Sequence, residues 1–264
     1  MVQYLPMRPR KNLESVVRAA FKKKHYVPNI VFKSFAEKKD AVLTPGSSRN
    51  FVLDLQRSGL MRSAGRGWST ILETSKFDYS APVRELADKL GVWFPYAEAK
   101  CWSTRQLVNF FHHLPGTFYT YVYIDRSVMG QLRDRLEENW TSSRVFVNPS
   151  ATSFLSERKA NENFVIRPIT RDDEIKEAKM LPIESILVDF AAEAELVIDG
   201  WDYGEIVRGV VSVSLIDAHA ILRRIARRRF ASRNTVTLCD VLFAEGIEND
   251  SVRKFYLQLK KKFA

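Results

Sequence analysis

The stretch "RSGLMRSAGRGWSTI", from Arg57 to Ile71, predicts a β-hairpin with positive charge at its end. Two strand-like segments, residues 60–63 and 68–72, are separated by a short connection that contains two glycines. Such a connection between two apolar runs is typical of a hairpin with a longer loop. Three arginines stand beside and within the turn, so the hairpin is a candidate for contact with an anionic partner.

The positive charge of the chain is concentrated in its first quarter. The whole sequence has 41 lysines and arginines against 31 acidic residues, which gives a net charge of +10. Residues 1–72 hold 14 of the basic residues and only 4 of the acidic ones, so the other 192 residues are neutral overall. An excess confined to one end indicates a polyanionic partner, either nucleic acid or an anionic membrane surface.

Three short amphipathic helices are predicted before the hairpin. Asn12 is a candidate N-cap for the first, in which apolar residues recur at helical spacing over residues 13–21. The second begins near Ile30, and the third follows the turn at residues 44–46 and ends at Gly59. Three helices followed by a hairpin is the order of a winged helix-turn-helix domain, in which the third helix lies in the major groove of DNA.

In that arrangement the third helix and the hairpin supply the contacts to DNA. Serine side chains and the first amides of the helix suit phosphate, whereas Arg49 and Asn50 suit the edges of guanine and adenine. Arg66 at the hairpin tip is expected along the backbone or in the minor groove. A domain of the same shape that binds only protein is the alternative. The predicted DNA-binding residues are Ser47, Ser48, Arg49, Asn50, Arg57, Arg62 and Arg66.

The rest of the chain predicts a mixed α/β domain that ends in a helical layer. Residues 73–81 are polar and aperiodic and read as a linker, after which Pro82 opens a helix. The fold class is therefore α+β, with a winged helix-turn-helix domain over 1–72 and an α/β domain over 82–264. Strands are expected at 93–96, 117–124, 144–147 and 164–167, helices after Ser103 and Ser127, and helices from Pro182 to the end.

Acidic and basic residues are segregated within this second domain. Residues 172–205 hold eleven acidic residues against two lysines, while arginines crowd the predicted helix at 221–233. Three interpretations stay open: intramolecular pairing of the acidic and basic helices, a second phosphate-contacting patch, or a surface for a protein partner. The candidate second basic patch comprises Arg223, Arg224, Arg227 and Arg228.

The sequence lacks the motifs that would predict an enzyme or a cofactor. A P-loop, GxSxG, HExxH and GxGxxG are all absent. Cys101, Cys239 and the four histidines lack the spacing of metal ligands, so no metal is expected and both cysteines are predicted to be buried thiols. Without a signal peptide or an apolar run of roughly 18 residues, the chain is expected in the cytoplasm.

One short motif requires a separate interpretation. Glu98-Ala99-Lys100 matches the E-x-K pattern of metal-dependent nucleases, where a carboxylate holds Mg²⁺ and a lysine orients the attacking water. Such a site also needs an aspartate on an upstream strand, but Asp78 and Asp88 fall in the linker and in a predicted helix. The motif is therefore expected to be an exposed surface loop, and a nuclease with a DNA-binding arm stays as an alternative.

The order of motifs resembles that of the antitoxins of AbiE abortive-infection systems, the type IV toxin–antitoxin class. The resemblance rests on "GRGW" at the hairpin tip, then "VWFPYAEAKCWSTRQLVNFF", "FYTYVYIDR", "RVFVNPS", "FVIRPI", "LPIESILVDF" and "YGEIVRGVV". It implies a bacterial repressor of its own operon that binds inverted repeats in double-stranded DNA through the winged helix. It also implies that the C-terminal domain counteracts a nucleotidyltransferase-like toxin without forming a stable complex.

Overall fold

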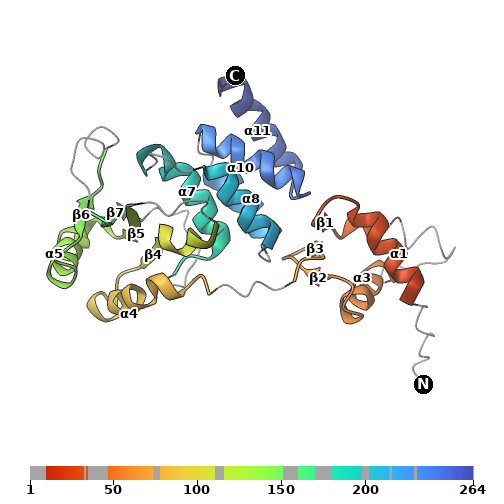
Figure 1. Ribbon diagram of the computed structural model, residues 1–264, viewed down its shortest axis with the longest axis horizontal. Helices are drawn as coiled ribbons and strands as arrows, with labels where there is room; N and C mark the ends of the chain where they lie inside the picture. The colour runs from red at the N-terminus through yellow and green to blue at the C-terminus, as the bar shows by residue number, and fades with distance from the viewer. Residues whose placement is uncertain are drawn as a thin grey trace.

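The protein is α+β and consists of three parts arranged in a row (Figure 1). A small sheet with two helices forms one end, a larger sheet with two helices forms the other, and a layer of helices lies between them. No helix among the described residues has both the length and the apolar character needed to cross a membrane. The computed structural model describes residues 10–32, 34, 47–73, 78–110, 116–150, 160–169, 180–197, 202–213, 216–228 and 231–263.

The N-terminal part contains the predicted third helix and the predicted hairpin. Its antiparallel sheet has the order β1-β3-β2, with Tyr26 opposite Thr70 and Arg62 opposite the same residue from the other side. The first helix begins at Arg10, ahead of the predicted cap Asn12. The elements are α1 (Arg10–Phe21), β1 (Tyr26–Pro28), α3 (Ser47–Arg57), β2 (Arg62–Ser63) and β3 (Trp68–Thr70).

Apolar residues at helical spacing hold this part together. Leu13, Val16 and Val17 face one way on α1 and pack with Phe51 and Leu55 of α3 in one buried cluster. A helical turn at residues 30–32 adds Phe32 to the cluster. Apart from Ser34, the rest of the predicted second helix lies outside the described residues.

The second part is a mixed sheet of four strands in the order β4-β5-β7-β6. β4 runs antiparallel to β5, whereas β7 runs parallel to both of its neighbours. The predicted strands at 117–124, 144–147 and 164–167 are confirmed as β5, β6 and β7. β-Branched and aromatic residues, which favour strands, are frequent in all three. The elements are α4 (Arg84–Trp93), β4 (Ala99–Ser103), β5 (Phe118–Ile124), α5 (Met129–Asn139), β6 (Arg144–Val147) and β7 (Glu162–Pro168), with short 3₁₀ helices η1 (Ala81–Val83), η2 (Thr104–Phe110) and η3 (Arg126–Val128).

The two faces of this sheet are buried against different helices. On the outer face, α4 and α5 pack against side chains such as Val122 and Ile166. On the inner face, Trp102 and Tyr121 stack with ring centroids 4.6 Å apart and join a large cluster with the central helices. The central helices are α7 (Ile183–Val197), α8 (Tyr203–Val213), α9 (Ala218–Arg228), α10 (Arg233–Ala244) and α11 (Asp250–Phe263).

Two predictions for this region are wrong. Residues 93–96 do not form a strand, because α4 extends to Trp93 and a turn follows it. The strand lies further on, at β4, and it contains Ala99 and Lys100, both of which are buried rather than part of an exposed loop. The Lys100 ammonium lies 2.6 Å from the carboxylate of Glu98, and this pairing allows a lysine to occupy a buried strand.

The helix caps near the second sheet are partly as predicted. The Ser103 hydroxyl accepts from the amide of Arg105, and the amide of Ser103 donates to the side chain of Gln106, so Ser103 does begin the η2 helix. At η3 the cap is Asp125, whose carboxylate accepts from the amide of Ser127, rather than Ser127 itself. Both are local side chain to backbone bonds of the kind that start helices.

The N-terminal part packs directly on the central helices. Tyr26, Ala64 and Trp68 belong to the same buried cluster as residues of α8, α9 and α10. Tyr26 is fully buried there. The division of the chain at residues 73–81 stays a prediction, but the two predicted domains share a core.

Candidate nucleic-acid interface

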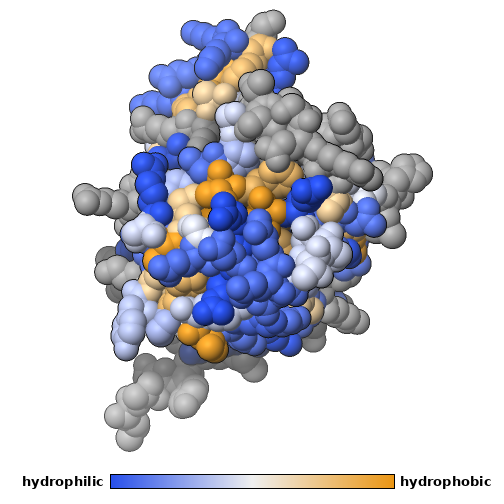
Figure 2. Space-filling view, turned by 90° about the vertical axis from the view of Figure 1, so that its left-hand side faces the viewer, coloured by the Kyte–Doolittle hydropathy of each residue, from blue (hydrophilic) through white to orange (hydrophobic). Residues whose placement is uncertain are grey.

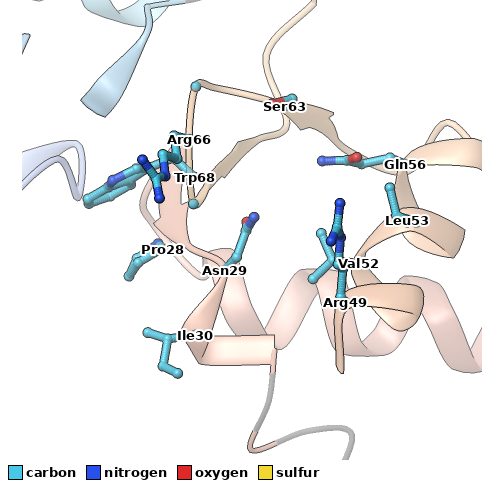
Figure 3. A pocket seen from close by; sticks show the side chains of 12 residues that line it. Pro28, Asn29, Ile30, Arg49, Val52, Leu53, Gln56, Ser63, Arg66 and Trp68 are labelled. Carbon is cyan, nitrogen blue, oxygen red and sulfur yellow. The ribbon is translucent and has the colours of Figure 1, made fainter. Parts of the chain in front are cut away.

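A groove of about 750 Å³ opens between α3, the end of β1 and the hairpin (Figure 3). Arg49 and Gln56 project from the α3 wall, and Arg66 and Trp68 stand on the hairpin wall. The groove thus has arginines on two opposing elements and amide and apolar groups between them. Its lining consists of Pro28, Asn29, Ile30, Arg49, Val52, Leu53, Gln56, Ser63, Gly65, Arg66, Gly67 and Trp68.

The sequence of α3 separates a buried side from a groove side. Phe51 and Leu55 point into the core of the N-terminal part. Arg49, Leu53 and Gln56 recur at positions i, i+4 and i+7, which places them along one line of the helix surface. This line forms the α3 wall of the groove.

The predicted site residues on the hairpin and on α3 do not all meet in the groove. Arg49 and Arg66 do, and both are exposed. Asn50 and Arg62 are exposed outside the lining, and Arg57 lies 3.7 Å from Asp54 in an exposed ion pair. Ser47 and Ser48 start α3, but their side chains lie outside the described residues.

Three polar residues of the groove, Asn29, Gln56 and Ser63, are not among the predicted site residues. Asn29 accepts a hydrogen bond of 2.7 Å from Ser69, and its backbone amide donates to Gly67, so it joins β1 to the hairpin. Gln56 follows Arg49 by two helical turns, and that spacing was a readable signal. Asn29 gave no such signal because its place in the groove depends on the folding of the hairpin.

The hairpin turn borders both the groove and the central helices. Gly65 and Gly67 adopt positive φ angles of 87° and 77°, which favour glycine. Arg66 and Gly67 are exposed, whereas Ala64 is buried and its carbonyl accepts a hydrogen bond of 3.0 Å from the amide of Ala218 at the start of α9. The start of the turn, at Ala64, is therefore docked on the central helices.

The predicted second basic patch is divided between interior and surface. Arg224 and Arg228 both pair with the buried carboxylate of Asp189 in α7, at 2.9 and 2.8 Å. Arg223 and Arg227 are exposed on α9. Of the three interpretations, intramolecular pairing therefore accounts for Arg224 and Arg228.

The described residues at the far end of the molecule do not show a comparable concentration of positive charge. Hydrophilic residues cover the middle of that face, with smaller hydrophobic areas around them (Figure 2). On α5 the exposed side chains carry both signs, because Arg133 and Arg135 alternate with Asp134, Glu137 and Glu138. The basic excess and the groove thus occur together at the N-terminal end.

The residues considered for catalysis or metal binding are Lys100 with Glu98 and the two cysteines. Lys100 is buried beside Glu98, and the described part of the chain contains no group of three potential metal ligands. Cys101 and Cys239 are buried free thiols, as predicted, and burial raises the pKa of each to about 12. Thiols with such pKa values stay protonated and unreactive near neutral pH.

Glu184 at the start of α7 provides a pH-dependent prediction. Burial raises the pKa of its carboxyl, although the amide of Asp217 donates to it at 2.7 Å and opposes this shift. The folded state therefore holds the proton of Glu184 more tightly than the unfolded chain does. The contribution of this carboxyl to the free energy of unfolding is fully present at low pH and is lost as the pH rises through the raised pKa. We expect Glu184→Gln, which keeps the acceptor oxygen, to raise the denaturant midpoint at pH 7 but not at about pH 4. An equal change at both pH values would contradict this assignment.

A protein family matches most of the chain, from α3 to α10. The comparison of this chain with curated proteins and with solved structures found no match. The matched region contains the α3 wall of the groove, the hairpin, the four-stranded sheet and most of the central helices. Because residues 49–242 match, the chain belongs to DUF6577, a family of unknown function.

Proposed function

We propose that this protein binds double-stranded DNA in the groove between α3 and the hairpin. The observation that carries the proposal is that Arg49 on α3 and Arg66 on the hairpin line one groove. Arginine is suited to both guanine edges and phosphate oxygens. The groove also lies in the quarter of the chain that holds its whole net charge of +10.

The order of elements supports a winged-helix mode of binding. Helix, strand, helical turn, helix and hairpin follow one another, and β3 lies between β1 and β2. In such domains the third helix enters the major groove, so α3 would present Arg49 and Gln56 to base edges. Arg66 would then contact the backbone or the adjacent minor groove.

The resemblance to AbiE antitoxins extends the proposal to a cytoplasmic repressor that also opposes a toxin. One winged helix covers one half-site, so an operator of inverted repeats would require two copies of the chain. The C-terminal domain would counteract a nucleotidyltransferase-like toxin. Co-expression with the toxin encoded beside it, scored by growth, tests this second activity separately from DNA binding.

Arginine substitutions in the groove test the DNA proposal. Arg49→Ala is expected to weaken specific binding by roughly 1–3 kcal/mol and to relax preference at one base position. Arg66→Ala is expected to reduce the slope of log K for DNA binding against log salt by about 0.9. The reason is that one phosphate contact is lost, and with it the release of counterions from that phosphate. Fluorescence anisotropy over a salt series measures both effects. Arg133→Ala on exposed α5 is the matched control and should change neither.

The apolar side of the groove supports a second candidate, a protein partner. Ile30 is 69% exposed and Leu53 is 36% exposed, and both line the groove. Two such residues could bury the apolar face of a helix, and that association would depend weakly on salt. Absence of DNA binding by the unaltered chain at low salt would exclude the first candidate and leave this one.

A further inference from the structure

The hairpin turn is fixed to α9 as well as to its own sheet. The amide of Ala218, the first residue of α9, donates to the carbonyl of Ala64. Next to this bond the Asp217 carboxylate fills the space in which a side chain at Gly65 would begin. The contact between Ala64-Gly65 and residues 217–218 is called the hairpin–α9 contact below.

Asp217 cannot easily move out of this position. Its carboxylate accepts a hydrogen bond of 2.9 Å from the amide of Ala220 and so caps α9. Its own amide donates at 2.7 Å to the buried carboxylate of Glu184. Any group added at Gly65 therefore meets a side chain that is bonded to the amide of Ala220, on a backbone that is bonded to Glu184.

A second set of bonds holds the neighbouring strand to the same helices. The Tyr26 hydroxyl accepts from the amide of Ile216 and donates to the carbonyl of Val211, both at 3.2 Å. The Tyr26 amide donates to the carbonyl of Glu245 at 3.1 Å. β1 thus has its own attachment, so loss of the hairpin–α9 contact would displace the hairpin tip rather than release the whole N-terminal part.

We propose that Gly65 is a positioning residue for the groove: its lack of a side chain lets the hairpin dock on α9, and docking holds Arg66 opposite α3. Arg66 follows Gly65 directly, so Arg66 takes its position in the groove from the docked residues Ala64 and Gly65. This inference rests on the proposed binding of DNA. It makes the C-terminal helices part of the DNA-binding unit, although they lie outside the groove.

Coupling of this kind acts in both directions. If docking favours DNA binding, then bound DNA favours docking to the same degree. The amide of Ala218 reports docking because its acceptor is the carbonyl of Ala64. Hydrogen exchange at Ala218 is therefore expected to slow when DNA is bound, whereas exchange at Ala220, whose acceptor is Asp217 within the helical part, should change less.

The test compares Gly65→Ala with Gly65→Ala/Asp217→Gly in the full-length chain. The single variant is expected to reduce the slope of log K for DNA binding against log salt by about 0.9. Between 1 M and 0.1 M salt, the affinity of the variant would then rise about eightfold less than that of the unaltered chain. The double variant keeps the strain of alanine at positive φ, but it removes the Asp217 carboxylate that would meet the new side chain. Its slope of log K against log salt should therefore return to the wild-type value. Asp217→Gly alone should keep the wild-type slope, since glycine is tolerated at an N-cap.

The outcomes separate this inference from the proposed function. If the unaltered chain binds no DNA, both are wrong. If it binds DNA and Gly65→Ala keeps the wild-type slope, or the double variant fails to restore it, only the inference is overturned. Should Gly65→Ala not fold, unchanged exchange at Ala218 on addition of DNA to the unaltered chain overturns it instead.

Discussion

Replacement of Gly246 by alanine is expected to lower the free energy of unfolding by roughly 2–6 kcal/mol. Gly246 follows the end of α10 with a φ of 94°, and its amide donates to the carbonyl of Phe243. A side chain there would meet the backbone carbonyl of Tyr26. Because backbone atoms cannot rotate away, β1 or the end of α10 has to move.

The size of this effect follows from what such a movement breaks. The amide of Tyr26 is bonded to Glu245, and the Tyr26 ring is fully buried among the central helices. Loss of a buried hydrogen bond costs about 1–3 kcal/mol, in addition to about 1–3 kcal/mol for a non-glycine residue at this φ.

Urea unfolding of Gly246→Ala should be compared with that of Gly59→Ala. The difference between their losses of unfolding free energy measures the cost of the clash with the Tyr26 carbonyl. Gly59 has a φ of 72° and nothing within 4 Å of its would-be side chain, so its substitution carries only the backbone cost. Equal losses in the two variants would show that the close approach of Tyr26 to α10 contributes nothing.

Much of the secondary structure could be predicted from local sequence. β5 is filled by aromatic and β-branched residues, and the hairpin has its glycines at the turn, so both signals are strong. β4 was missed because its residues include Lys100, which periodicity treats as a solvent-exposed position. Only the pairing of Lys100 with Glu98 in the folded chain makes that position compatible with burial.

The candidate site was predictable only where it depends on one helix or one turn. Arg49 could be assigned to the outer side of α3, and Arg66 to the hairpin tip, from spacing alone. The hairpin–α9 contact joins residues that are far apart in sequence through one backbone bond and one glycine. No periodic pattern encodes such a contact, so the packing of the hairpin on the central helices could not be predicted from the sequence.

Replacement of Asp189 by alanine is expected to lower the free energy of unfolding by roughly 3–5 kcal/mol. Its carboxylate is fully buried and lies 2.9 Å from Arg224 and 2.8 Å from Arg228, whose side chains are each only 11% exposed. Removal of the carboxylate takes a buried anion away from two largely buried guanidinium groups. Breaking such a pair from one side costs far more than the pair itself contributes.

Denaturant unfolding should compare Asp189→Ala with Asp54→Ala. Asp54 pairs with Arg57 on the surface of α3, where the two side chains are 61% and 77% exposed, so its loss should stay within about 0.5 kcal/mol. The comparison also decides what the arginines of α9 do. A large loss for Asp189→Ala assigns Arg224 and Arg228 to stability, which leaves Arg223 and Arg227 as the only members of the predicted second patch for a phosphate or a partner. A loss no larger than that of Asp54→Ala would mean that Arg224 and Arg228 reach solvent readily, and all four arginines would again be candidates for contact with DNA.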